Sequence, residues 1–241
     1  MMMDTKSRGD LVINGFGASN GGQFRVVTLN GRGTVNNDLE CLELDCNGSG
    51  ILNGNVISEK AKVNGHAKVR GSIDSKILTI DGSARIDKNL SAEKLKVSGK
   101  ATVGGRVKCE EIKIQGTFTV GEDCEAEIFK AESQFTIGGL LNADQVDIKM
   151  FGECKAKEIG GQTITVKAKG SLVGNLLKAF FKPQLETELI EGDKIELENT
   201  IAKVVRGNQV WIGPNCQIGL VEYTEEFSMD KKAIVTENRK V

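Results

Sequence analysis

The chain has 241 residues, with 32 lysine and arginine side chains against 33 aspartate and glutamate side chains. The resulting net charge of −1 gives no electrostatic argument for binding nucleic acid or anionic lipid. Glycine is abundant, at 29 residues, while proline occurs only twice, which suits a β protein with many tight corners.

Residues 1–23 are predicted to form a short flexible tail and a partial first coil. The segment Leu11-Val12-Ile13-Asn14-Gly15 imitates the rows that follow it, with one extra residue. No apolar run in the chain reaches the length of a signal peptide or a transmembrane helix, so we expect neither.

Residues 24–170 are predicted to form one β-helical domain, built on a repeat of seventeen residues that is regular up to about residue 160, where the register slips. Each repeat places a glycine after a polar turn-forming residue such as Asn47 or Asp81. A fixed period of this kind is typical of a repeat protein in which stacked units share one core. The glycines at this spacing are Gly31, Gly48, Gly65, Gly82, Gly99 and Gly116.

Stacking the sequence in rows of seventeen aligns the apolar and small residues in six columns. One column starts at Val27 and another at Leu29, and four more start at Gly33, Val35, Leu39 and Cys41. Within a row these positions form three pairs with a spacing of two, which is the periodicity of β-strands. The pattern predicts three short strands per coil, and therefore an all-β, parallel β-helix of triangular section.

Residues 171–183 are predicted to form an amphipathic helical insertion that Pro183 ends. Two interpretations remain open for this insertion. It covers exposed core or a strand edge, or it binds a membrane surface or a partner. Its apolar residues recur at helical spacing: Leu172, Val173, Leu176, Leu177, Phe180 and Phe181.

The strand pattern resumes over residues 184–228, which we predict to form additional C-terminal coils with an irregular period. Residues 229–241 are predicted to be a charged tail that frays.

The cysteines do not resemble a disulfide framework. Cys41, Cys46, Cys109, Cys124 and Cys154 fall in the inward columns, where cysteine serves as a small apolar residue. We therefore expect reduced thiols and a cytoplasmic protein.

No pattern for catalysis, a cofactor or a metal is present in the sequence. The single histidine, His66, falls in an outward column, and no cysteine–histidine spacing fits a metal site. The densest line of carboxylates, which includes Glu59 and Asp144, runs beside lysines as a solvated ridge. No glycine-rich phosphate loop is found. We expect no enzyme activity, no small-molecule substrate and no nucleic-acid partner.

The two ends of a β-helix are unpaired faces of free N–H and C=O groups over exposed core. If these ends lack caps, one molecule can continue the coil of the next without a nucleotide.

The rows "VNGHAKVRGSI", "VSGKATVGGRV" and "IQGTFTVGEDC", together with their spacing, resemble the bactofilins, a family of polymer-forming bacterial cytoskeletal proteins. The resemblance covers residues 24–160, and other stretches are similar to the longer variants of spore-forming Gram-positive bacteria. It implies a right-handed β-helix that polymerises through its end coils and supports cell shape, wall synthesis or motility. It also implies a related subunit in the polymer and a peripheral association with the cell membrane.

The polymer contact is not transferred to a given residue, because the chain extends beyond the usual domain. The candidate apolar interface residues are Phe180, Phe181, Trp211, Tyr223 and Phe227. The leading hypothesis is a non-enzymatic scaffold that forms filaments. A capped monomeric or dimeric adaptor and a carbohydrate-active enzyme are the alternatives.

Overall fold

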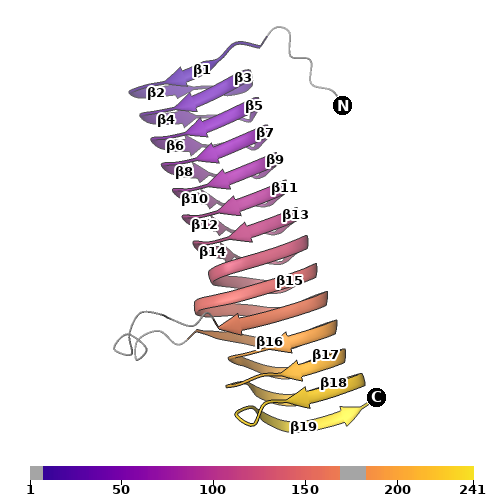
Figure 1. The fold of residues 1–241 in the computed structure, drawn as a ribbon. Helices are drawn as coiled ribbons and strands as arrows, with labels where there is room; N and C mark the ends of the chain where they lie inside the picture. Colours follow the sequence, from indigo (N-terminus) through magenta and orange to yellow (C-terminus); the bar gives the residue numbers. More distant parts are fainter. Residues whose placement is uncertain (1–7, 169–182) are drawn as a thin grey trace, which may run out of the picture. The chain divides into compact units, whose positions relative to one another are not determined.

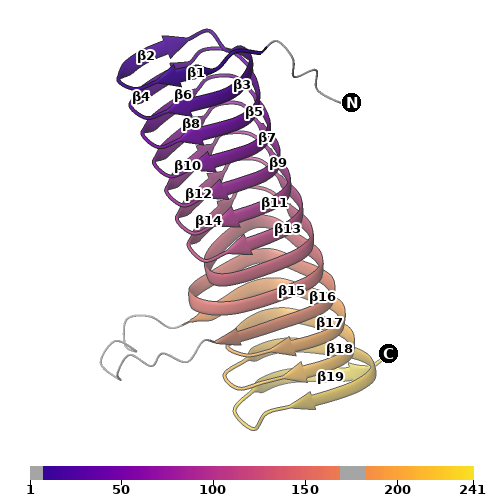
Figure 2. The ribbon, with the colours of Figure 1, turned by 45° about the horizontal axis from the view of Figure 1, so that its top comes forward.

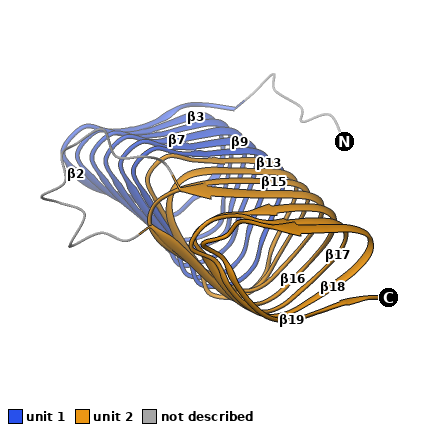
Figure 3. Ribbon diagram, turned by 60° about the horizontal axis from the view of Figure 1, so that its bottom comes forward, with its two compact units in different colours: residues 1–110 blue, residues 111–241 orange. Residues whose placement is uncertain are grey.

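The computed structural model describes residues 8–168 and 183–241, and every helix or strand assigned within those ranges is a β-strand (Figure 1). Contacts divide the chain into two compact units, Met1–Glu110 and Glu111–Val241 (Figure 3). The predicted helix, including Phe180 and Phe181, lies outside the described residues except for its last position. The strands are β1 (Leu11–Ile13), β2 (Phe16–Ser19), β3 (Gly22–Leu29), β4 (Arg32–Val35), β5 (Leu39–Cys46), β6 (Ser49–Leu52), β7 (Val56–Val63), β8 (His66–Val69), β9 (Ile73–Ile80), β10 (Ser83–Ile86), β11 (Leu90–Val97), β12 (Lys100–Val103), β13 (Val107–Ile114), β14 (Thr117–Val120), β15 (Cys124–Ala168), β16 (Gln184–Leu197), β17 (Thr200–Ile212), β18 (Gln217–Met229) and β19 (Ile234–Lys240).

Unit 1 is a parallel β-solenoid in which a long strand and a short strand alternate (Figure 2). The long strand β7 pairs in parallel with β5 and β9, and the short strand β8 pairs with β6 and β10. Val56 lies opposite Leu39 on one side and Ile73 on the other, so the register repeats every seventeen residues, as the glycine spacing predicts.

Each coil of unit 1 contains two strands, so the prediction of three short strands is wrong. In β7 the inward residues Ser58 and Ala61 are separated by two consecutive outward residues, Glu59 and Lys60. Pairing with β5 skips Glu59 and resumes at Lys60, so the strand bends at these two residues and then continues. Two of the predicted strands are therefore one bent strand, and the three inward pairs per coil are retained.

The inward columns form the core, as predicted. Their side chains are almost inaccessible to solvent, with exposures of 0% for Val27, Leu29 and Val97. Ala126, which is half-buried, is the exception. The column that starts at Gly33 holds glycine and alanine in unit 1. In unit 2 the same column holds Phe118 and Phe135, which are both buried. Burial of this apolar surface is the main force that holds successive coils together.

One corner of unit 1 is built from a ladder of asparagines and a stack of glycines. The Nδ2 atoms of Asn30, Asn47 and Asn64 donate to the Oδ1 atoms of the asparagines one coil earlier, at 2.8, 2.9 and 2.7 Å. A Cβ atom added at Gly48 would lie 2.1 Å from the carbonyl oxygen of the preceding glycine. Glycine is therefore required in this column because two backbones approach each other closely.

The first coil of unit 1 consists of β1 and β2, which pair with β3 and β4. Leu11 lies opposite Val27, sixteen residues later, so this coil is one residue shorter than the others. The prediction that this row has one extra residue is therefore wrong, because the row has one residue fewer. The predicted partial first coil is present.

Unit 2 continues the parallel pattern with longer strands and an irregular period. The strand β15 runs for 45 residues, because its corners do not interrupt the extended backbone. Leu185 lies opposite Thr200, fifteen residues later, and Ile201 lies opposite Gln217, sixteen residues later. The additional C-terminal coils are therefore present, and a register shift at Gly207 contributes to their irregularity.

The final segment of the chain is a strand, so the prediction of a fraying tail is wrong. β19 pairs in parallel with β18, with Ile234 opposite Gln217 and Lys240 opposite Tyr223. Ala233 is 9% exposed and continues the inward pattern. The pairing with β18 orders this charged segment because its backbone groups complete a parallel ladder.

All six cysteines are free and buried. Burial raises the pKa of the Cys41, Cys109 and Cys154 thiols to about 12. Because the thiolate is the reactive form, these residues behave as apolar packing groups.

Candidate assembly surfaces

The first coil of unit 1 exposes the ends of several inward columns. Among the described strands, β1 pairs only with β3, so its other edge carries unpaired backbone groups. Leu11 ends the column of Val27, and Phe24 on β3 ends the column of Cys41. Both side chains are half-buried, whereas the residues that follow them in their columns are fully buried. This edge therefore combines free hydrogen-bonding groups with accessible apolar surface.

Two further apolar side chains of the first coil point outward. Val12 is 54% exposed, and Phe16 is 87% exposed. The guanidinium of Arg32 lies 5.6 Å from the centroid of the Phe16 ring. Among the large apolar side chains of the described residues, Phe16 is the most exposed.

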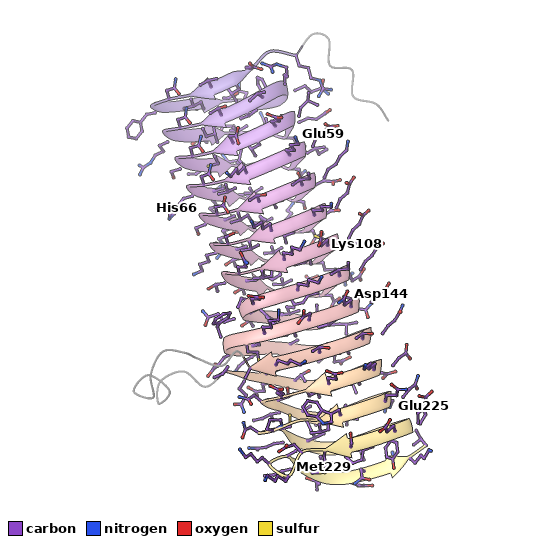
Figure 4. The ribbon with its side chains drawn as sticks, in the orientation of Figure 1. Glu59, His66, Lys108, Asp144, Glu225 and Met229 are labelled. Atoms are coloured by element: carbon purple, nitrogen blue, oxygen red, sulfur yellow. The ribbon has the colours of Figure 1, made fainter. Side chains whose placement is uncertain are left out.

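The C-terminal coil of unit 2 has a similar apolar edge on the second half of β18. Among the described strands, β19 covers Gln217–Tyr223 but not the residues that follow them. Val210, which is 3% exposed, is succeeded in its column by Phe227, and the fully buried Ile212 is succeeded by Met229. Phe227 is half-buried. Met229, which is labelled in Figure 4, is 43% exposed. No next coil of the chain covers these two columns among the described residues.

The part of the edge that β19 covers is polar. Asn238 lies opposite the buried Val221, and Lys240 lies opposite Tyr223. Arg239 donates to the carboxylate of Glu222, which also accepts a hydrogen bond from Arg206 at 2.7 Å. The last coil is thus apolar over one half and charged over the other.

The hydrogen bonds from Arg239 and Arg206 hold the pKa of Glu222 below its ordinary value of 4.5. A carboxyl group whose pKa is lowered by folding stabilises the protein above its unfolded-state pKa. That contribution is lost as the pH falls through the folded-state pKa. We therefore expect Glu222→Gln to be less stable than the natural protein at pH 7, and the difference to disappear in acid.

Urea denaturation of both proteins at neutral and acidic pH measures this effect. The control is Glu226→Gln, which changes an exposed carboxylate of the same strand that forms no ion pair among the described residues. A difference that persists unchanged into acid would contradict the role of the Glu222 carboxylate.

The interface residues predicted from the sequence lie in different places. Trp211 lies on β17 between Glu196 and Ser228 of the flanking coils, outside the uncovered edge, and its ring packs against Gly213. Tyr223 and Phe227 lie together on β18, with ring centroids 5.5 Å apart. Sequence reasoning missed four residues of these edges: Leu11, Phe24, Met229 and Phe16. Following each inward column to its last member would have found the first three, whereas the outward-pointing Phe16 belongs to none of these columns.

The single histidine of the chain is a surface residue. His66 is exposed and points outward, as predicted (Figure 4). Within the described residues, no group of three or more histidine, cysteine or carboxylate side chains could hold a metal ion. Among the same residues, no helix is long and apolar enough to cross a membrane.

Unit 2 has an open groove of about 630 Å³. Gly161, Gly192 and Gly207 lie in register along it, and its charged lining includes the ion pair of Arg206 with Glu191 at 3.0 Å. The residues that line the groove include no histidine, serine or cysteine.

Two curated proteins of Bacillus subtilis (strain 168) are similar to this chain. "Uncharacterized protein YhbE" is 50% identical over 104 residues, and "Uncharacterized protein YhbF" is 39% identical over 104 residues. The similarity covers 43% of this chain and 44% and 42% of the two relatives, so the chain matches less than half the length of each. No family model and no solved structure matches the chain.

Proposed function

We propose that the protein is a non-enzymatic cytoskeletal scaffold that assembles end to end, without nucleotide or cofactor, as the bactofilins that it resembles do. The observation that carries the proposal is the pair of uncovered coil edges. One edge ends in Leu11 and Phe24 of unit 1, and the other ends in Phe227 and Met229 of unit 2. In this proposal a second copy of the chain is the occupant of each edge.

Two physical terms support this assembly. Each uncovered edge offers unpaired backbone groups of parallel strands, which a further strand satisfies. Each edge also offers apolar column ends, and fully burying one such side chain contributes about 1.5–3 kcal/mol. Both terms are identical to those that hold successive coils of one chain together, so the contact between copies requires no new chemistry.

The proposal places the protein in the cytoplasm, with a role in cell shape, wall-related processes or motility. It includes a related subunit in the same polymer and a peripheral association with the membrane. The buried, reduced cysteines are compatible with this compartment. The YhbE and YhbF proteins carry no functional name, so the support comes from the coil edges and the resemblance.

A double variant, Phe227→Asp with Met229→Asp, tests the C-terminal edge. Two charges on the uncovered columns remove the apolar contact, so we expect the critical concentration for sedimentation to rise about 100-fold or more, for a loss of about 3 kcal/mol. Ultracentrifugal pelleting across a concentration series measures this rise. If the double variant does not fold, Met229→Asp alone tests the same edge, because this side chain is 43% exposed and its substitution leaves the core intact.

The matched control is Ser228→Glu, which places a charge between these two residues on the outward side of the same strand. We expect it to pellet like the natural protein. Equal pelleting of all the variants would show that this edge is not the contact.

The polar half of the last coil favours a second candidate function, a capped adaptor that binds partners without polymerising. Asn238, Arg239 and Lys240 cover part of the edge in the way that polar caps end other solenoids. A chain that sediments as a monomer or dimer at every concentration would favour this adaptor.

A further inference from the structure

Six asparagine–glycine steps occur in unit 1, and such steps can deamidate. The glycine amide nitrogen attacks Cγ of the asparagine, which releases the side-chain nitrogen as ammonia and leaves a cyclic imide. Water then opens the ring to aspartate or to isoaspartate, so one water is consumed for each ammonia released. The reaction needs a free amide and a backbone that can rotate. The six steps are Asn14–Gly15, Asn20–Gly21, Asn30–Gly31, Asn47–Gly48, Asn53–Gly54 and Asn64–Gly65.

Hydrogen bonds hold most of the attacking amides. The amides of Gly31, Gly48 and Gly65 donate to carbonyl oxygens of the preceding coil at 3.2, 2.9 and 3.0 Å. The Gly21 amide donates to Ser19 Oγ at 3.4 Å. Each of these bonds must break before the nitrogen can attack, which slows the reaction by the cost of the local opening.

Among the described residues, the Gly15 and Gly54 amides have no hydrogen-bond acceptor. Packing separates these two steps. A Cβ atom added at Gly54 would lie 2.4 Å from backbone atoms of Asn37 and Asp38, whereas one added at Gly15 would meet nothing within 4 Å. Gly15 is exposed because no earlier coil of unit 1 lies against it among the described residues.

We propose that Asn14–Gly15 is a spontaneous deamidation site on the first coil of unit 1. It alone combines a free amide with an unpacked backbone among the six steps. Oδ1 of Asn14 accepts a hydrogen bond from Asn30 Nδ2 at 2.8 Å, and a carboxylate at this position can accept the same bond. The aspartate product therefore keeps the asparagine ladder and the fold, and both products give the first coil a negative charge.

The consequence for assembly rests on the proposed function. Deamidation adds a charge to an uncovered coil edge, and the isoaspartyl product also lengthens the backbone by one methylene. A copy bound to that edge would cover Gly15 and slow the reaction. The modification would then act on unassembled copies, so that their ability to join a filament declines with age.

Peptide mapping by mass spectrometry of the full chain tests the site. The protein is held in mildly alkaline buffer, at a concentration where it sediments as a monomer, so the outcome does not depend on assembly. We expect Asn14 to deamidate first and at least about tenfold faster than any other asparagine–glycine step, the factor that one lost hydrogen bond supplies. The same chain unfolded in urea is the reference, in which all six steps are free.

Gly15→Ala is the matched variant, because a Cβ atom slows attack by the amide and nothing in the structure opposes it at this position. We expect it to abolish the early deamidation at Asn14 and to leave the other five rates unchanged. Earlier modification at any other step, or no modification at Asn14 while the unfolded chain is converted, would overturn the proposal. Reduced pelleting of the deamidated fraction would support the consequence for assembly, and unchanged pelleting would refute that consequence alone.

Discussion

Val97→Asp is expected to unfold unit 1 or to lower its free energy of unfolding by about 4 kcal/mol or more. Val97 is 0% exposed and lies opposite Ile80 in an inward column. A carboxylate there has no partner and no access to water, so it destabilises the core that all coils of the unit share. Urea denaturation followed by circular dichroism measures the loss.

The matched control is Lys96→Glu, one residue away on the same strand. Lys96 is exposed and lies opposite Thr79, so we expect its change in stability to stay within about 0.5 kcal/mol. Ile114→Asp, which changes a buried residue of unit 2, is expected to behave like Val97→Asp. Similar stability of all three variants would contradict the assignment of inward and outward columns.

Gly82→Ala is expected to cost about 3 kcal/mol, at the upper end of the range for overpacking a protein interior. A Cβ atom at Gly82 would lie 2.1 Å from the carbonyl oxygen of Gly65 and 2.3 Å from that of Asn64. Both atoms belong to the backbone, so neither can rotate away as a side chain would. The coils must separate locally, which weakens the parallel hydrogen bonds on both sides of the corner.

The matched control for this variant is Gly15→Ala, in the same structural column but on the first coil. No atom lies within 4 Å of its added Cβ, so we expect nearly unchanged stability. Equal losses in both variants would mean that an intrinsic requirement for glycine, and not the approach of the preceding coil, explains the column.

The period and the columns could be read from the sequence because each residue type has one environment in every coil. Leu78 and Ile80 point inward and are buried, while Thr79 between them is only half-buried, and the same alternation returns seventeen residues later. The number of strands could not be read from the sequence. Residues on both sides of the bend at Glu59 and Lys60 still face the core, so the pattern of inward residues is the same for one bent strand as for two strands. Outward pairs in the middle of a row are compatible with a corner or with a bend.

The two ends of the chain were less predictable because the period changes there. The first coil is one residue shorter than the rows, and the pairings of β16 to β18 are offset by fifteen and sixteen residues. A charged sequence in β19 gave no apolar pattern, although its pairing with β18 orders it. Backbone pairing of this kind depends on an available strand edge and leaves little trace in side-chain composition.

The candidate site shows the same limit. Of the aromatic candidates within the described residues, Phe227 lies on the uncovered C-terminal edge. Tyr223 lies opposite Lys240 of β19 in the covered half, and Trp211 packs beside its own coil. Met229 and Leu11 were missed because nothing in their residue type distinguishes them from core residues. Their exposure follows from their position as the last members of their columns, which depends on where the coils end.

Negative-stain electron microscopy of the purified protein across a concentration series, without nucleotide, tests end-to-end assembly most directly. We expect filaments a few nanometres wide that appear above a critical concentration, and a loss of these filaments in the Phe227→Asp/Met229→Asp variant. Single particles of one chain at every concentration would contradict assembly and would leave the capped adaptor as the function of this solenoid.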